Sequence, residues 1–139
     1  MKILLDSNII IYSLNKLSPK CMQAQGFIVE HQSNLVVAHQ DMNETLRILT
    51  HKTFPSSMTS GQALKAVDGI LQGLEIINPP PVTYNIVKEL ISLYKLKGNA
   101  VFDAYLVATM LSNDISHIAT DNVKHFKLFK QIKVVNPFN

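Results

Sequence analysis

Short apolar segments alternate with longer amphipathic ones along the whole sequence, and this alternation limits the folds open to the chain. The apolar segments are only a few residues long, as buried strands are. They are Lys2–Leu5, Leu35–Ala38, Glu75–Ile77, His117–Ala119 and Val134–Val135. Strands separated by helices run parallel and need cover on both faces. The pattern therefore predicts an α/β protein with three layers, α/β/α, around a central, mainly parallel sheet.

Periodic apolar side chains mark the helices between these strands. After His39 they recur at intervals of three and four residues, and Val101–Leu111 is almost entirely apolar, which predicts a central packed helix. Ser18 followed by Pro19 favours a helix start with Ser18 as the N-cap. Further helices are expected at residues 9–14, 61–73, 82–96 and 123–129.

Composition restricts the organisation and the chemistry of the chain. Its 139 residues, 47% of them hydrophobic and 17% charged, have the size and make-up of one domain, residues 1–139. Asp6 interrupts the first apolar run well before the length of a signal peptide or membrane span, so we expect a soluble, cytoplasmic protein with no membrane partner. The single Cys21 excludes an internal disulfide and a cysteine-based zinc site. No two histidines have the spacing of a helical zinc site.

Four acidic residues are placed where the predicted fold has its working edge. In open parallel sheets the functional crevice lies beyond the carboxyl ends of the strands. Asp6 and Asp121 each follow a predicted strand, and Glu44 lies on a helix that can face the same edge. Asp103 interrupts the otherwise apolar helix. We therefore expect these four carboxylates to meet in one pocket.

Carboxylates gathered in a pocket are typical of a site for a hard divalent cation. Like charges brought close together raise one another's proton affinity, and a bound cation removes that cost. Ligands that are all oxygen suit Mg²⁺ or Mn²⁺, which polarise a phosphodiester and make a bound water a better nucleophile. The sequence thus favours hydrolysis of phosphodiester bonds without a protein nucleophile.

Each acid also has a plainer interpretation when it is taken alone. Asp6 can serve only as an N-cap, and Glu44 as a solvated helix residue paired with Arg47. Asp103 can be held by amide groups at the start of its helix, and Asp121 can be a turn residue. Their joint placement is what indicates a site.

The charge balance is compatible with a polyanionic substrate. The formal net charge is +3, and once the four acids are set aside, the 13 lysines and arginines outnumber the remaining acids by more than two to one. An acidic pocket in a basic surface suits a nucleic acid that approaches a bound cation. Lysines that merely solvate helix faces are the alternative.

Several motifs resemble those of the PIN-domain family and, within it, of VapC-type toxins. They are Ile3–Asn8, Met42–Leu46, Phe102–Ala104 with Ala108 and Thr109, Ile118–Asn122 with Phe126, and Val134–Phe138. The resemblance implies a PIN-like fold with a central parallel sheet, Mg²⁺ or Mn²⁺ held by Asp6, Glu44 and Asp103, and endoribonuclease activity on RNA. It further implies a homodimer and inhibition by a VapB-like antitoxin protein.

The same resemblance assigns supporting roles and shows one departure. Asn8 and Thr120 match positions that order the pocket in similar proteins. Many relatives carry a fourth acid two residues after that threonine, where this chain has Asn122. The acid here stands one residue earlier, at Asp121. We therefore take Asp121 as the fourth catalytic and metal-binding residue and Asn122 as a supporting residue. Which of the two fills the fourth position of the site stays open at this point.

Two other functions remain as alternatives. A phosphatase of the haloacid-dehalogenase type also opens with a strand that ends in Asp, but it needs a second Asp where this chain has Asn8. The other alternative is a non-catalytic PIN-like module that binds RNA or a protein. Metal-dependent cleavage of RNA separates these from the nuclease.

Overall fold

The computed structural model describes residues 1–139 and contains a five-stranded sheet in which every neighbouring pair is parallel. The strand order is β3-β2-β1-β4-β5. The strands are β1 (Ile3–Leu5), β2 (Leu35–Ala38), β3 (Glu75–Ile77), β4 (His117–Ala119) and β5 (Lys133–Val135). The first strand in sequence is thus the central one in space, which makes its carboxyl end the middle of the functional edge.

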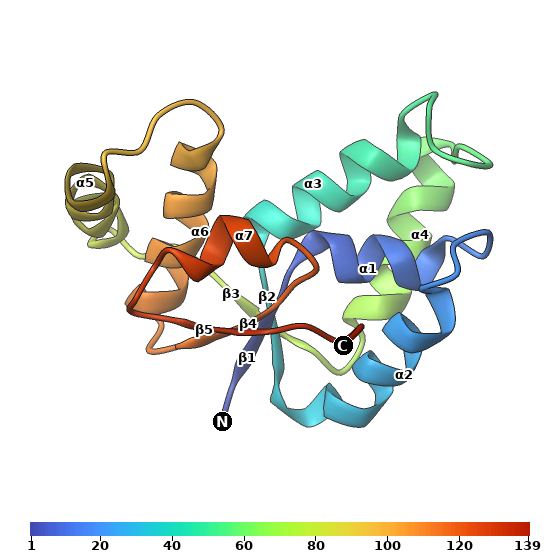
Figure 1. Ribbon diagram of the computed structural model, residues 1–139. Coiled ribbons are helices and arrows are strands. Elements are labelled where there is room, and N and C mark those ends of the chain that lie inside the picture. The colour runs from blue at the N-terminus through green and yellow to red at the C-terminus, as the bar shows by residue number, and fades with distance from the viewer.

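Helices cover both faces of this sheet, as Figure 1 shows. They are α1 (Ser7–Leu14), α2 (Cys21–His31), α3 (His39–Thr50), α4 (Ser60–Leu71), α5 (Thr83–Tyr94), α6 (Ala100–Ser112) and α7 (Val123–Lys127), with a short 3-10 turn at Gln32–Asn34. Helices α5 and α6 lie on one side, and α1, α2 and α4 on the other. The predicted three-layer α/β/α architecture is confirmed.

Two apolar cores result from the alternation of side chains along the strands. Leu4 of β1 packs into the core beneath α5 and α6, whereas its neighbours Ile3 and Leu5 pack beneath α1 and α2. The nearly apolar α6 is central to the first core, where Ala104 and Ala108 are fully buried. This burial fixes the direction in which the first turn of α6 presents Asp103.

The elements lie close to their predicted ranges, with one difference at the second helix. Helix α2 begins at Cys21, and Ser18 and Pro19 belong to the turn before it. The Ser18 hydroxyl accepts a hydrogen bond from the Lys20 amide within that turn, so it does not act as the helix N-cap. Cys21 is the first residue of this helix, and it is buried.

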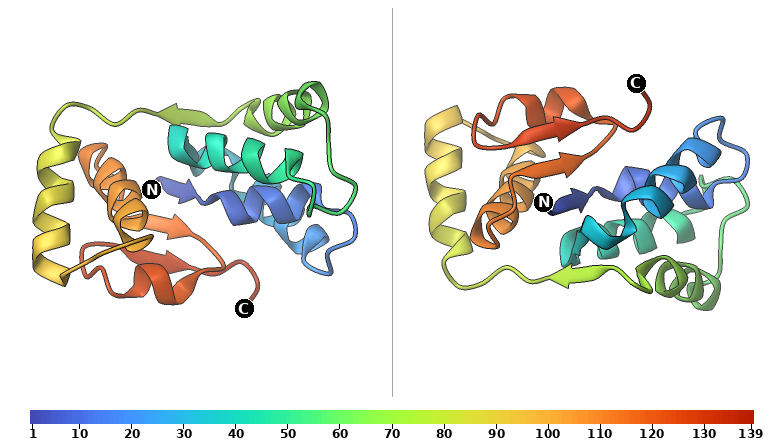
Figure 2. Two further views of the ribbon diagram at one scale, coloured as in Figure 1. Left: turned by 90° about the horizontal axis from the view of Figure 1, so that it is seen from above. Right: turned by 90° about the horizontal axis from the view of Figure 1, so that it is seen from below.

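The strand order places a switch of direction between β1 and β4. The chain moves outward from β1 to β2 and β3, and then returns to build β4 and β5 on the other side. Helices α1 and α3, which follow β1 and β2, run side by side above this point (Figure 2). A switch point of this kind is where open α/β sheets bind ligands.

No helix combines the length and the apolar character that a transmembrane span requires.

Candidate active site at the carboxyl edge of the sheet

A cavity of about 530 Å³ lies at the carboxyl edge of the sheet, and three of the four predicted acids line it. Asp6 follows β1, Glu44 lies on α3, and Asp103 lies in the first turn of α6. Three segments that are far apart in sequence therefore contribute carboxylates to one cavity.

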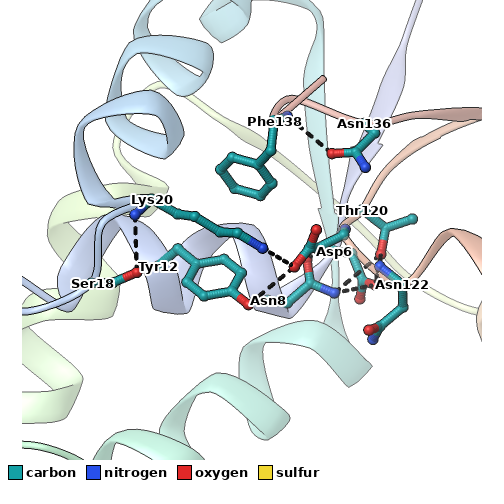
Figure 3. A network of polar contacts seen from close by, with 10 residues as sticks. Asp6, Asn8, Tyr12, Ser18, Lys20, Thr120, Asn122, Asn136 and Phe138 are labelled. Atoms are coloured by element: carbon teal, nitrogen blue, oxygen red, sulfur yellow. Dashed lines mark hydrogen bonds and ion pairs between the residues drawn. The ribbon is translucent and has the colours of Figure 1, made fainter.

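Asp6 forms the buried floor of this cavity and is held by several donors. Its Oδ1 accepts a hydrogen bond from the Ser7 amide at 2.8 Å, which caps helix α1. Its Oδ2 accepts from the Thr120 hydroxyl at 2.7 Å and from the Asn8 amide group at 3.2 Å. The Asp6 side chain is consequently fixed relative to the carboxyl ends of β1 and β4 (Figure 3). Asp6 acts as the helix cap, and Ser7 and Asn8 lie inside the helix.

Asn8 and Thr120 connect this carboxylate to the turn after β4. Asn8 Nδ2 also donates to Thr120 Oγ1 at 3.1 Å, and Asn8 Oδ1 accepts from the backbone amide of Asp121 at 3.1 Å. The Asn122 amide donates to Thr120 Oγ1 at 3.0 Å. Contacts of this kind are what we would expect if Asn8 and Thr120 order the pocket.

Asp103 and Glu44 have weaker protein partners than Asp6. Asp103 Oδ2 lies 3.4 Å from His125 Nδ1, and Glu44 Oε1 lies 3.9 Å from Arg47. Burial raises the pKa of Asp103 above its ordinary value, His125 lowers it, and the negative charges of Asp6 and Glu44 raise it. The three acids therefore repel one another across the cavity, and a cation would relieve that repulsion.

Asp121 lies elsewhere than expected, because its carboxylate faces away from this cavity. Asp121 Oδ2 accepts hydrogen bonds from Lys20 Nζ at 2.8 Å and from the Tyr12 hydroxyl at 3.0 Å. Lys20 runs between the rings of Tyr12 and Phe138, with its Nζ 5.0 Å from each centroid (Figure 3). Burial, followed by the neighbouring Asp121, raises the pKa of Tyr12. The residue of this turn that lines the cavity is Asn122.

Asp41 is an acid near the site that the sequence interpretation missed. It lies in the first turn of α3 and is buried, with 1% of its surface exposed. Its Oδ1 accepts a hydrogen bond from the Ser7 amide at 3.3 Å, and the same amide donates to Asp6 Oδ1. The signal was its position three residues before Glu44, which makes the two side chains neighbours on one helix.

The carboxylate oxygens around the cavity are ligands that fit a hard divalent cation. No group of three or more Asp, Glu, His or Cys side chains is close enough to hold a metal ion without rearrangement. Mg²⁺ does not require such a group, since it keeps several waters and is commonly bound through one or two carboxylates. The acids lining the cavity supply only oxygen, and their mutual repulsion favours a cation.

Comparison with known proteins identifies the family. The PIN domain family model matches residues 3–131. A search of curated proteins returns no match. Among solved structures, VapBC2 from Rickettsia felis bound to a fragment of its promoter DNA has a TM-score of 0.75 at 19% identity, with 98% of both chains covered. VapBC-1 from nontypeable Haemophilus influenzae has a TM-score of 0.75 at 18% identity, with both chains covered in full.

A third structure carries a description of its activity. VapC20 from Mycobacterium tuberculosis, described as a toxin that cleaves the sarcin-ricin loop, has a TM-score of 0.70 at 14% identity, with 95% of this chain and 99% of that chain covered. At such identities the likeness is one of fold. The resemblance drawn from the motifs is confirmed by the family match: the chain belongs to the PIN domain family.

Proposed function

We propose that this protein is a divalent-metal-dependent endoribonuclease and the toxin of a VapBC-type toxin–antitoxin pair. The observation that carries the proposal is the lining of one cavity by Asp6, Glu44 and Asp103, at the switch point of a PIN-domain sheet. The description of VapC20 as a toxin that cleaves the sarcin-ricin loop, which is an RNA element, supports RNA as the substrate class. We assign the ion to Asp6, Glu44 and Asp103, and we give Asp121 a positioning role through the turn that holds Asn8.

The side chains around the cavity have separate tasks in such a reaction. When bound, Mg²⁺ or Mn²⁺ polarises the phosphodiester and favours deprotonation of a water. The Asp6 side chain is held in its orientation, because Thr120 and Asn8 donate hydrogen bonds to one of its oxygens. Arg47 and His125 line the same cavity and can donate hydrogen bonds to phosphate oxygens. The chain thus offers anionic groups for a cation and donors for the RNA backbone.

Cleavage of single-stranded RNA tests the proposal directly. We expect the purified protein to cleave RNA with Mg²⁺ or Mn²⁺ and to lose this activity with EDTA. Asp6→Asn and Asp103→Asn should each reduce the rate by about 100-fold or more while the protein remains folded, because they remove a charge that the ion needs. Asp68→Asn removes one negative charge from the exposed face of α4, away from the cavity, and should cleave as wild type does.

Other results would favour the alternatives. RNA binding without metal-dependent cleavage would indicate a non-catalytic PIN-like module. Hydrolysis of small phosphate esters but not of RNA would indicate a phosphatase. The contacts of Asn8 speak against the second alternative, because its side chain donates to Asp6 and is not an acid.

A partner protein and a dimer are part of the same proposal. Structures with this fold include VapBC proteins, one of them bound to promoter DNA, which supports a VapB-like antitoxin as the partner of this protein. We propose the cytoplasm as its location. We expect the protein to be a homodimer in size-exclusion chromatography with light scattering. Co-expression with the small open reading frame beside its gene should give a stable complex that no longer cleaves RNA. A monomer that forms no such complex would contradict this part of the proposal.

A further inference from the structure

Asp41 is a buried acid to which the proposed reaction gives no task. It lies in α3, 1% exposed, beneath the cavity that Asp6 and Glu44 line. A carboxylate is rarely buried to this extent unless a partner compensates its charge. Its surroundings therefore indicate what it does.

Asp41 is a direct neighbour of Asp6. The amide of Ser7 donates to Asp6 Oδ1 at 2.8 Å and to Asp41 Oδ1 at 3.3 Å, so that two carboxylates share a single N–H group. Ser7 and Asp6 both line the cavity. The Asp41 carboxylate consequently lies directly behind the residue that the proposed function places at the ion.

The second oxygen of Asp41 has no partner in the protein. Asp41 Oδ2 is buried and makes no hydrogen bond. Burial raises the pKa of Asp41 well above its ordinary value, and the charge of Asp6, and then that of Glu44, adds to this rise. Two neighbouring carboxyl groups that share one N–H group and form no ion pair therefore favour a proton on Asp41 in the metal-free protein. A divalent cation in the cavity would favour the ionised form of Asp41 in place of that proton.

We propose that Asp41 is a fourth acidic residue of the ion site, whose carboxylate behind Asp6 adds to the negative charge that a bound divalent cation neutralises. This inference rests on the proposed function. The remaining acid near the cavity, Asp121, is held by Lys20 and Tyr12, and the side chain that lines the cavity in its place is the neutral Asn122. Helix α3 therefore supplies two of the four acids.

Binding of Mn²⁺ without RNA tests this role separately from catalysis. Asp41→Asn has nearly the same shape and keeps an oxygen for the Ser7 amide, but it removes the charge. We expect isothermal titration calorimetry to show about tenfold weaker Mn²⁺ binding for this variant. Its melting temperature without metal should equal or exceed that of wild type, because an uncompensated buried charge is gone. The rise in melting temperature on adding Mn²⁺ should accordingly be smaller.

Two matched variants make the result decisive. Asp68→Asn loses the same charge far from the cavity and should bind Mn²⁺ as wild type does, whereas Asp103→Asn should bind it more weakly. If Asp41→Asn binds as wild type while Asp103→Asn does not, the role of Asp41 is overturned and the proposed function stands. If the wild type neither binds Mn²⁺ nor cleaves RNA, both are overturned. Should Asp41→Asn fold poorly, Asp41→Ser, which is neutral and retains an acceptor, provides the same comparison.

Discussion

Lys20 Nζ lies 2.8 Å from Asp121 Oδ2, and this ion pair joins the turn before α2 to the turn after β4. The Tyr12 hydroxyl donates to the same carboxylate oxygen. Since the backbone amide of Asp121 holds Asn8, the ion pair bears indirectly on the orientation of Asp6. Asp121 is thus linked to Asp6, which lines the cavity, through the side chain of Asn8.

A double-mutant cycle tests the coupling of this pair. Lys20→Met and Asp121→Asn should each lower the melting temperature, because each variant removes the same ion pair. The variant with both changes should lose little more than either single variant, whereas independent residues would give additive losses. Thermal unfolding followed by circular dichroism measures the effect. Additive losses would show that the pair does not act as a unit.

RNA cleavage distinguishes a supporting Asp121 from one that holds the ion. Asp121→Asn should reduce the cleavage rate by less than about tenfold, since the ion keeps the acids that line the cavity, whereas Asp103→Asn should reduce it by about 100-fold. Rates at saturating Mg²⁺ for both folded variants provide the comparison. An equal loss for the two variants would return Asp121 to the ion site, as the sequence led us to expect.

Removal of the Thr120 hydroxyl tests how far the support of Asp6 matters. Thr120 is fully buried, and its hydroxyl donates to Asp6 Oδ2 at 2.7 Å while accepting from the Asn122 amide. Thr120→Val keeps the shape but removes the hydroxyl that bonds to Asp6, to Asn8 and to the Asn122 amide, which should cost about 1–3 kcal/mol of unfolding free energy. It should also weaken Mn²⁺ binding by about tenfold or more.

Urea denaturation and Mn²⁺ titration measure these two effects. The control is Thr50→Val on α3, where the exposed hydroxyl only bonds back to its own helix. That variant should change the unfolding free energy little and Mn²⁺ binding not at all. Normal Mn²⁺ affinity in Thr120→Val would mean that Asp6 does not depend on this contact.

The stability of the metal-free protein should depend on pH through Asp41. Its pKa in the folded protein is raised well above 3.8, so the folded state binds the proton more tightly than the unfolded chain. The stabilisation linked to this proton is fully present below pH 3.8 and is lost as the pH rises through the raised value. Asp41→Asn, which cannot ionise, should therefore become progressively more stable relative to wild type as the pH rises.

The measurement is a series of urea denaturation curves in EDTA, recorded at increasing pH from 3.8 upward. Asp68→Asn serves as the comparison, because its difference from wild type should not grow with pH in this way. A constant difference between Asp41→Asn and wild type would contradict the prediction.

Local patterns were enough to predict the layers of the fold, but not its strand order. Alternating short strands and amphipathic helices account for β1 to β5 and for the cover on both faces. The order β3-β2-β1-β4-β5 depends on how the helices pack across long stretches of chain, which no local pattern records. Ser18 and Pro19 are a common helix start, yet here the Ser18 hydroxyl is used inside a turn, and the helix begins at Cys21.

The candidate site was predictable to the extent that its residues stand out in sequence. Asp6 after a strand and Asp103 within an apolar helix are both conspicuous, and both line the cavity. The engagement of Asp121 by Lys20 joins residues 101 positions apart and leaves no local trace. Asp41 was overlooked because an acid in the first turn of a helix usually complements the helix dipole at the surface.

The central place of β1 has a consequence for the timing of folding during synthesis. This strand can pair with β2 only after residues 35–38 have been made, and its other edge remains open until β4, residues 117–119, has left the ribosome. Only then can Thr120 reach Asp6 and the cavity take shape. A nascent chain shorter than this can have neither the finished sheet nor its carboxylate pocket, so an unfinished molecule lacks the cavity that the proposed nuclease would use.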